Sequence, residues 1–196
     1  SFLFNTIIYM TKGLLALYGE SFRLGGQNSR DRGSDKSYKE QMAAAKTHMK
    51  FIESLKLKNV DMKVSINSYT TKFDKSLKDV YKDVLVYSIF YPDLLGQTHL
   101  IRSCIDKMKI LNTNEFDFVL FMRIDLFLKD KFMEIFNPYS DNILFPSICW
   151  KIGNSHMAGP HPRVNDMMLF TPKKYVRYVR NVIKIGHDTW SCLVDD

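Results

Sequence analysis

The chain has 196 residues, of which 45% are hydrophobic and 25% are charged. These proportions are ordinary for a globular protein with a real core, so intrinsic disorder is not the default interpretation. They favour a single domain over residues 1–196, as a whole protein or as the N-terminal part of a longer one. The formal net charge of +7 favours anionic partners without specifying them.

The cysteine and hydropathy patterns indicate in which cellular compartment the protein is expected. Three cysteines, Cys104, Cys149 and Cys192, are too few and too scattered for a disulfide framework, and none has zinc-site spacing. No apolar run reaches the roughly 18 residues of a membrane span. The first nine residues lack the basic region of a signal peptide, and Met10 could be the natural start. We therefore expect a cytoplasmic protein without a membrane span.

Apolar periodicity predicts the elements of the first half of the chain. In order, it predicts a buried strand over residues 13–18, a polar loop over 19–37, an amphipathic helix over 38–57, an alternating strand over 60–66 with a polar end at 67–71, a short helix over 73–81 and a strand over 84–90. Strands and helices already alternate in this half.

The second half continues the alternation. It predicts a helix over residues 94–111, a strand over 116–124, a short helix over 131–136, a brief strand over 142–145, a Gly/His/Pro-rich loop over 149–162, a strand over 167–170 and a helix over 175–185 that Pro172 introduces. We interpret the loop, with His156 and His161, as a lid rather than a metal site. The whole pattern predicts an α/β domain whose mostly parallel sheet is covered on both faces.

Two opposite charges interrupt the apolar stretch FDFVLFMRIDLFLK. Arg123 and Asp125 fall where this buried strand would end, which is the edge at which open α/β sheets bind ligands. An ion pair that covers the strand end is one interpretation. The other is a site in which Asp125 holds Mg²⁺ or Mn²⁺ and Arg123 holds a phosphate.

Four segments in this order resemble a known family. GLLALYGESFR, VSINSYTTKFDKSL, FDFVLFMRIDLFLK and PRVNDMMLFTPKKY with GHDTW are similar to glycosyltransferase domains of the GT-A type, especially those encoded by large algal DNA viruses. The resemblance implies a Rossmann-like domain with a mixed, mostly parallel sheet flanked by helices. It also implies a UDP-sugar donor, a glycan or glycoprotein acceptor, and, for a viral protein, the host cytoplasm.

The resemblance assigns a metal ligand and a nucleotide site. The family's Asp-x-Asp metal motif is replaced here by Arg123-Ile124-Asp125, which leaves Asp125 as the carried-over ligand of Mn²⁺ or Mg²⁺, helped by the diphosphate itself. Residues expected to contact the nucleotide or its diphosphate are Gly19, Glu20, Arg23, Ser68, Tyr69, Thr70 and Arg123. A plain turn after the first strand and a polar strand cap are the structural alternatives.

The late segments carry the expected sugar and base residues. Asn165 and Asp166 would face the donor sugar, unless they only form an Asx turn. His187 would contact the sugar, the diphosphate or the metal, and Trp190 would contact the sugar, unless the segment is a helix cap with a core tryptophan. An inverting transferase needs a carboxylate base, for which we expect Asp188, with Asp166 as the second choice.

Three functional hypotheses follow. The leading one is a metal-dependent, inverting glycosyltransferase that uses a UDP-sugar. A metal-dependent nucleotidyltransferase or phosphodiesterase is the second, but those enzymes gather several carboxylates and Asp125 has no close partner in sequence. A nucleic-acid-binding domain is the third, although the chain has no RNA-recognition signature and no concentrated basic stripe.

Overall fold

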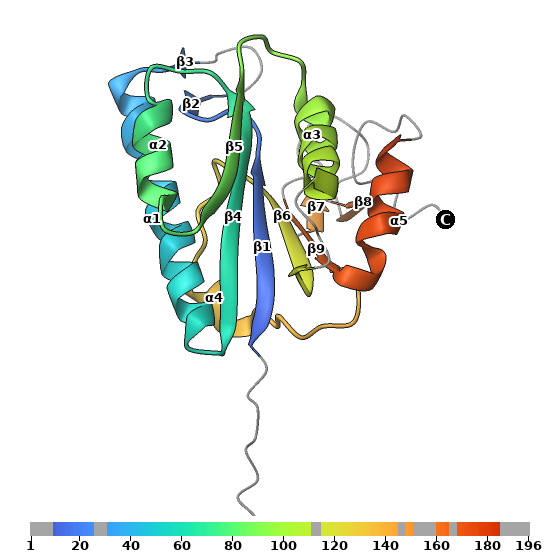
Figure 1. The fold of residues 1–196 in the computed structure, drawn as a ribbon. Coiled ribbons are helices and arrows are strands. Elements are labelled where there is room, and N and C mark those ends of the chain that lie inside the picture. Colours follow the sequence, from blue (N-terminus) through green and yellow to red (C-terminus); the bar gives the residue numbers. More distant parts are fainter. Residues whose placement is uncertain are drawn as a thin grey trace, which may run out of the picture.

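A computed structural model describes residues 10–25, 31–110, 115–144, 148–150, 160–164 and 168–184. A five-stranded sheet forms its centre, in the order β5-β4-β1-β6-β9 (Figure 1). The strands are β1 (Thr11–Tyr18), β4 (Val60–Tyr69), β5 (Leu85–Tyr91), β6 (Phe118–Arg123) and β9 (Met168–Pro172). The first four in that spatial order are parallel, and β9 is antiparallel to β6. The predicted α/β fold with a mostly parallel mixed sheet is confirmed.

Helices cover both faces of this sheet (Figure 1). One face carries α1 (Asp35–Lys56), α2 (Asp74–Tyr81) and α4 (Asp130–Ile135), and the other carries α3 (Gln97–Ile110) and α5 (Lys173–Lys184). Each face has its own apolar core, and successive residues of β1 contribute to the two cores alternately. Burial on both faces explains why the central strand is a continuous apolar run rather than an alternating one.

The loop predicted after the first strand contains two short strands. β2 (Arg23–Leu24) and β3 (Asp31–Arg32) pair antiparallel, with Arg23 opposite Arg32. Helix α1 then begins at Asp35, three residues before the predicted start, because the side chain of Ser34 accepts a hydrogen bond from the Ser37 amide and caps it. The first turn of the helix is polar, so the spacing of apolar residues did not include it in the predicted helix.

The predictions for residues 142–162 are partly wrong. Of the brief strand expected over residues 142–145, the described residues 142–144 form one isolated bridge, between Leu144 and Phe170. Both ends of the predicted loop lie in strands, because β7 (Ile148–Trp150) and β8 (Pro160–Val164) pair antiparallel. Residues 151–159, with the lid interpretation, lie outside the described part of the chain. β8 contains prolines, which are unusual in strands, so the sequence pattern did not predict a strand there.

Two further observations concern the expected absence of a membrane span and the role of the cysteines. Among the helices that the structure describes, none is both long and apolar enough to cross a membrane. Cys104 of α3 is a buried free cysteine, and burial raises the pKa of its thiol to about 12. This thiol is therefore a packing group rather than a nucleophile.

Candidate functional site

The strand order reverses next to β1. From β1 the chain moves through β4 to β5 on one side, and α3 then returns it to β6 on the other side of β1. The segments that follow β1 and β6 therefore meet at the carboxyl edge of the sheet, at a topological switch point. Open α/β sheets bind their ligands in the crevice at such a point. The sequence predicted this edge for the segment after β6, and the family resemblance implied it for the segment after β1.

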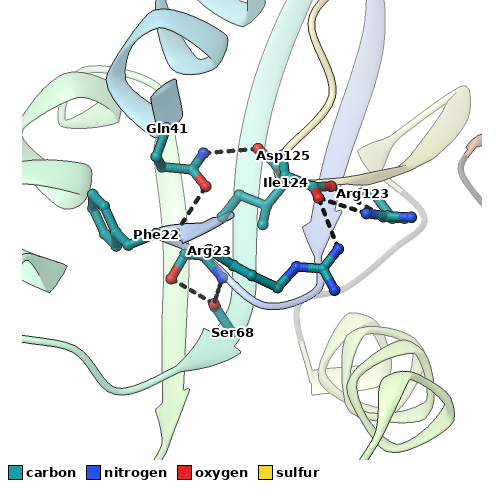
Figure 2. A network of polar contacts seen from close by, with 8 residues as sticks. Phe22, Arg23, Gln41, Ser68, Arg123, Ile124 and Asp125 are labelled. Carbon is teal, nitrogen blue, oxygen red and sulfur yellow. Dashed lines mark hydrogen bonds and ion pairs between the residues drawn. The ribbon is translucent and has the colours of Figure 1, made fainter. Parts of the chain in front are cut away.

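Two arginines from these segments converge on one carboxylate (Figure 2). Arg23 follows β1, and its Nη2 donates to Oδ2 of Asp125 at 3.2 Å. Arg123 ends β6, and its Nε donates to Oδ1 of Asp125 at 3.0 Å while its Nη2 donates to Oδ2. Both carboxylate oxygens are thus engaged, and 102 residues of sequence separate Arg23 from Asp125.

The three side chains form a partly exposed cationic cluster. They keep 18% (Arg23), 23% (Arg123) and 25% (Asp125) of their side-chain surface exposed. Burial disfavours the ionised form of Asp125, but the hydrogen bonds and positive charges of Arg123 and Arg23 outweigh it and hold the pKa of this carboxyl below its usual value. With Asp125 ionised, two guanidinium groups face one carboxylate, so the cluster carries a formal charge of +1.

The loop after β1 has an unusual backbone. Three of its residues, Gly19, Phe22 and Gly25, have φ values of 116°, 54° and 80°. Glycine adopts these angles at little cost, but Phe22 is strained there. Its ring is fully buried and packs against Tyr38 and Phe73. The aromatic anchor therefore holds the strained turn that directs the next residue, Arg23, towards the switch point.

Two buried polar side chains fix this loop to the rest of the edge (Figure 2). Gln41 of α1 accepts from the Phe22 amide and donates to the Ile124 carbonyl, so it joins the loops that follow β1 and β6. Ser68 accepts from the Ser21 amide at 3.0 Å and donates to the Ser21 hydroxyl at 2.8 Å. The expected nucleotide contact of Ser68 does not fit its complete burial, and its hydroxyl instead holds the loop.

A second polar cluster, built around Arg32, lies at the end of β4. Arg32 of β3 donates to the Thr70 carbonyl at 2.9 Å, lies 3.7 Å from the Glu20 carboxylate, and stacks 5.6 Å above the centre of the Tyr69 ring. Tyr69 is 4% exposed and donates its hydroxyl to the Gly96 carbonyl. Glu20, Tyr69 and Thr70 thus lie at the predicted edge, where they position Arg32.

A cavity of about 150 Å³ opens beside Asp125. Residues of α1 and of the two loops line it: Arg23, Leu24, Gly25, Glu40, Gln41, Asp125 and Phe127. Cavities of roughly this volume hold one six-membered ring in other proteins. Phe127 is 47% exposed although it lines this cavity, so an aromatic residue is accessible next to the arginines.

The described residues do not fit a divalent-cation site. Mg²⁺ and Mn²⁺ prefer several oxygen ligands, commonly carboxylates. Asp125 and Glu40 are the two carboxylates that line the cavity, and two guanidinium groups already occupy the oxygens of Asp125. No group of three or more His, Cys, Asp or Glu side chains that could hold a metal occurs among the described residues. The metal-ligand role of Asp125 stays a prediction that this donor set does not favour.

Five predicted residues cannot be placed. Asn165, Asp166, His187, Asp188 and Trp190 lie outside the described residues, so the expected base and sugar contacts stay predictions. The structure instead adds Arg32, Gln41 and Phe127, which the sequence analysis missed. A signal existed for Arg32, because the polar segment SRDRGSD follows the first strand. Gln41 and Phe127 sit in amphipathic or apolar patterns that gave no reason to select them.

Comparisons with known proteins add little to this geometry. No protein-family model matches the chain, and no curated protein matches it. The chain is similar to the crystal structure of a proposed nucleotide-diphospho-sugar transferase from Desulfovibrio desulfuricans G20, at 12% identity and a TM-score of 0.38. The alignment covers 60% of this chain and 48% of that chain. At this TM-score the likeness carries no argument, and the site geometry stands by itself.

Proposed function

We propose that the chain is a glycosyltransferase that transfers a sugar from a nucleotide-diphosphate sugar, with UDP as the expected nucleotide. One observation carries the proposal: Arg23 and Arg123 converge from two strand ends at the switch point of a mostly parallel sheet. Paired guanidinium groups suit phosphate oxygens, and the switch point is where such sheets bind nucleotides. The motif resemblance to GT-A domains supplies the reaction class.

The chemistry of glycosyl transfer fits a cationic site with an adjacent cavity. Negative charge develops on the departing diphosphate, and positive groups fixed nearby stabilise that charge in the transition state. Arg23 and Arg123 are suited to this role. The cavity beside them could take one ring of the donor against Phe127, with the Glu40 carboxylate at its wall as a polar contact.

The acceptor half of the reaction rests on the resemblance. An inverting transfer requires a carboxylate to take the proton from the acceptor hydroxyl. Asp188 is the proposed base and Asp166 the second choice, with Asn165, His187 and Trp190 as sugar contacts. A glycan or glycoprotein acceptor is proposed on the same ground. The cation that the resemblance implies would need Asp125 to leave its arginines and further ligands from elsewhere.

A donor panel tests the proposal directly. Thermal unfolding is measured in the presence of UDP, GDP, ADP or CMP and, for comparison, of the nucleoside of each. UDP-sugars are tested next, and their slow hydrolysis is followed by the release of UDP. We expect UDP to raise the melting temperature more than uridine does, because the diphosphate contacts the arginines. Failure of every nucleoside diphosphate to shift the melting temperature, with or without Mn²⁺, would exclude a nucleotide-sugar transferase.

A further inference from the structure

The carboxylate of Asp125 occupies the position that an anionic ligand would take. Its Oδ2 accepts from both arginines, with the Arg23 contact at 3.2 Å, and its Oδ1 accepts from Arg123 at 3.0 Å. Arginine binds a carboxylate and a phosphate with the same fork of N–H donors. Asp125 can therefore serve as an internal substitute for one phosphate group.

We propose that Arg23 and Arg123 bind the diphosphate of the donor without a divalent cation, and that Asp125 holds their anion site until the diphosphate displaces it from at least one of them. This inference rests on the proposed function, and it replaces the metal role that the resemblance assigns to Asp125. In this arrangement the guanidinium groups supply the positive charge that a cation would otherwise bring to the leaving group.

Charge supports this exchange. Two guanidinium groups against one carboxylate leave the cluster at +1, whereas a diphosphate brings at least two negative charges. The positive cluster therefore attracts the diphosphate, which carries more negative charge than the carboxylate that it displaces. The cluster is also partly exposed, at 18–25% of each side chain, so a ligand can reach it without unfolding of the loops.

The positions of the two arginines favour bridging of two phosphates. Arg23 belongs to β2 and Arg123 to the end of β6, and they approach Asp125 from different segments (Figure 2). Gln41 bonds to the residue before Arg23 and to the residue before Asp125, so both loops are fixed before a ligand arrives. A fixed pair of cations loses little conformational entropy on binding.

A cation at the same place would meet repulsion. It would have to displace both guanidinium groups from the Asp125 oxygens or bind within a few ångströms of them. Among the residues that line the cavity, only Asp125 and Glu40 could offer a carboxylate to such a cation, and the described residues contain no group of three metal-binding side chains. The arginine pair and a metal ion are therefore alternatives at this carboxylate rather than partners.

Calorimetric titration of the protein with inorganic pyrophosphate, UDP and uridine tests the inference. Each titration is made once with excess EDTA and once with MnCl₂. We expect pyrophosphate and UDP to bind in EDTA, Mn²⁺ to leave their affinities within roughly threefold, and uridine to bind far more weakly. Higher ionic strength should weaken pyrophosphate binding, because the contacts are between charges.

Three variants identify the groups. Arg23→Ala and Arg123→Ala should each weaken pyrophosphate binding by roughly tenfold or more, which is the scale of a lost hydrogen bond to a charged group. Asp125→Asn removes the competing carboxylate and should bind pyrophosphate more tightly than the parent. Arg177→Ala is the matched control, since Arg177 is exposed on α5, which packs on the opposite face of the sheet from α1.

The opposite outcome is equally definite. Binding of pyrophosphate and UDP that requires Mn²⁺ and is lost in Asp125→Asn overturns this inference and leaves the transferase proposal intact. Binding of pyrophosphate without metal, combined with no preference for any nucleoside diphosphate, supports the arginine site and overturns the transferase. Should Asp125→Asn fail to fold, the comparison of EDTA with MnCl₂ on the parent protein still decides between the two.

Discussion

Gln41 donates a hydrogen bond from its Nε2 to the carbonyl oxygen of Ile124 at 2.8 Å, across 83 residues of sequence. The other end of the same amide accepts from the Phe22 backbone at 3.2 Å. Gln41 is 3% exposed, so both backbone groups are satisfied by this side chain where water has little access. The spacing between Arg23 and Asp125 thus depends on one glutamine of α1.

Gln41→Met should uncouple the two loops. The substitution keeps a side chain of similar length but leaves the Phe22 amide and the Ile124 carbonyl without a partner. Each unsatisfied buried group costs about 1–3 kcal/mol, so we expect a clear fall in the free energy of unfolding by urea. Pyrophosphate binding should weaken as well. Lys39→Met, on the exposed side of α1, is the control and should change neither quantity.

His48 links the same region to two helices. Its Nε2 donates to the Leu126 carbonyl at 2.6 Å, since a carbonyl can only accept, and its Nδ1 lies 2.7 Å from the Tyr81 hydroxyl, from which a neutral imidazole accepts. Complete burial lowers its pKa to about 4, although the Leu126 hydrogen bond and the charge of Asp125 act in the other direction.

This histidine should make folding sensitive to acid. The unfolded chain binds a proton at His48 near pH 6.5, whereas the folded chain resists protonation down to about pH 4. Stability is therefore complete above pH 6.5 and is lost as the pH falls towards 4. At 1.36 kcal/mol per pKa unit the loss approaches about 3 kcal/mol. Urea unfolding at several pH values should show it in the parent and not in His48→Gln. Parallel pH curves for the two proteins would contradict this account.

The sequence predicted the parts of the fold that local patterns determine. β1 and β6 are continuous apolar runs because the sheet is covered on both faces, and α1 shows helical spacing because only one side of it is buried. The carboxyl edge followed from the strand ends alone. The strand end was enough to place Arg123 and Asp125 at this edge, whereas the place of Arg23 came from the family resemblance.

The contacts within the site depend on distances in space that a local pattern does not contain. Arg23 and Asp125 meet because β1 and β6 are neighbours, and that adjacency comes from a crossover through α3. Gln41 occupies an ordinary buried position of an amphipathic helix, so its role became visible only with its two backbone partners. Ser68 was predicted to face a ligand, yet which face of β4 it occupies depends on packing against the first loop.

Phe127 offers a test of the cavity. If one ring of the donor stacks on it, Phe127→Ala should weaken UDP binding by roughly tenfold, because stacking of a base on an aromatic ring is worth about 1–3 kcal/mol. Pyrophosphate, which has no ring, should bind Phe127→Ala and the parent alike. Tyr178→Ala, another exposed aromatic residue, is the control. Equal losses for UDP and pyrophosphate would indicate a displaced loop instead of a lost ring contact.

Phe22 combines a favourable side chain with an unfavourable backbone. Its φ of 54° lies in the left-handed region, which costs an L-residue roughly 1–2 kcal/mol. Its fully buried ring, in contact with Tyr38 and Phe73, offsets that cost. Truncation of a buried phenylalanine to alanine typically costs about 3–5 kcal/mol. Phe22→Ala should fall in this range, because it loses the ring and keeps the strain.

Glycine at the same position separates the two contributions. Phe22→Gly loses the same ring but adopts a positive φ without strain, so it should unfold at higher urea than Phe22→Ala. At ordinary positions the order is reversed, since glycine is about 1 kcal/mol worse than alanine within a helix. Phe51, fully buried in α1, supplies that control, and Phe51→Gly should be less stable than Phe51→Ala. If the order at position 22 matches that at position 51, the turn that directs Arg23 stores no strain, and the aromatic anchor serves packing alone.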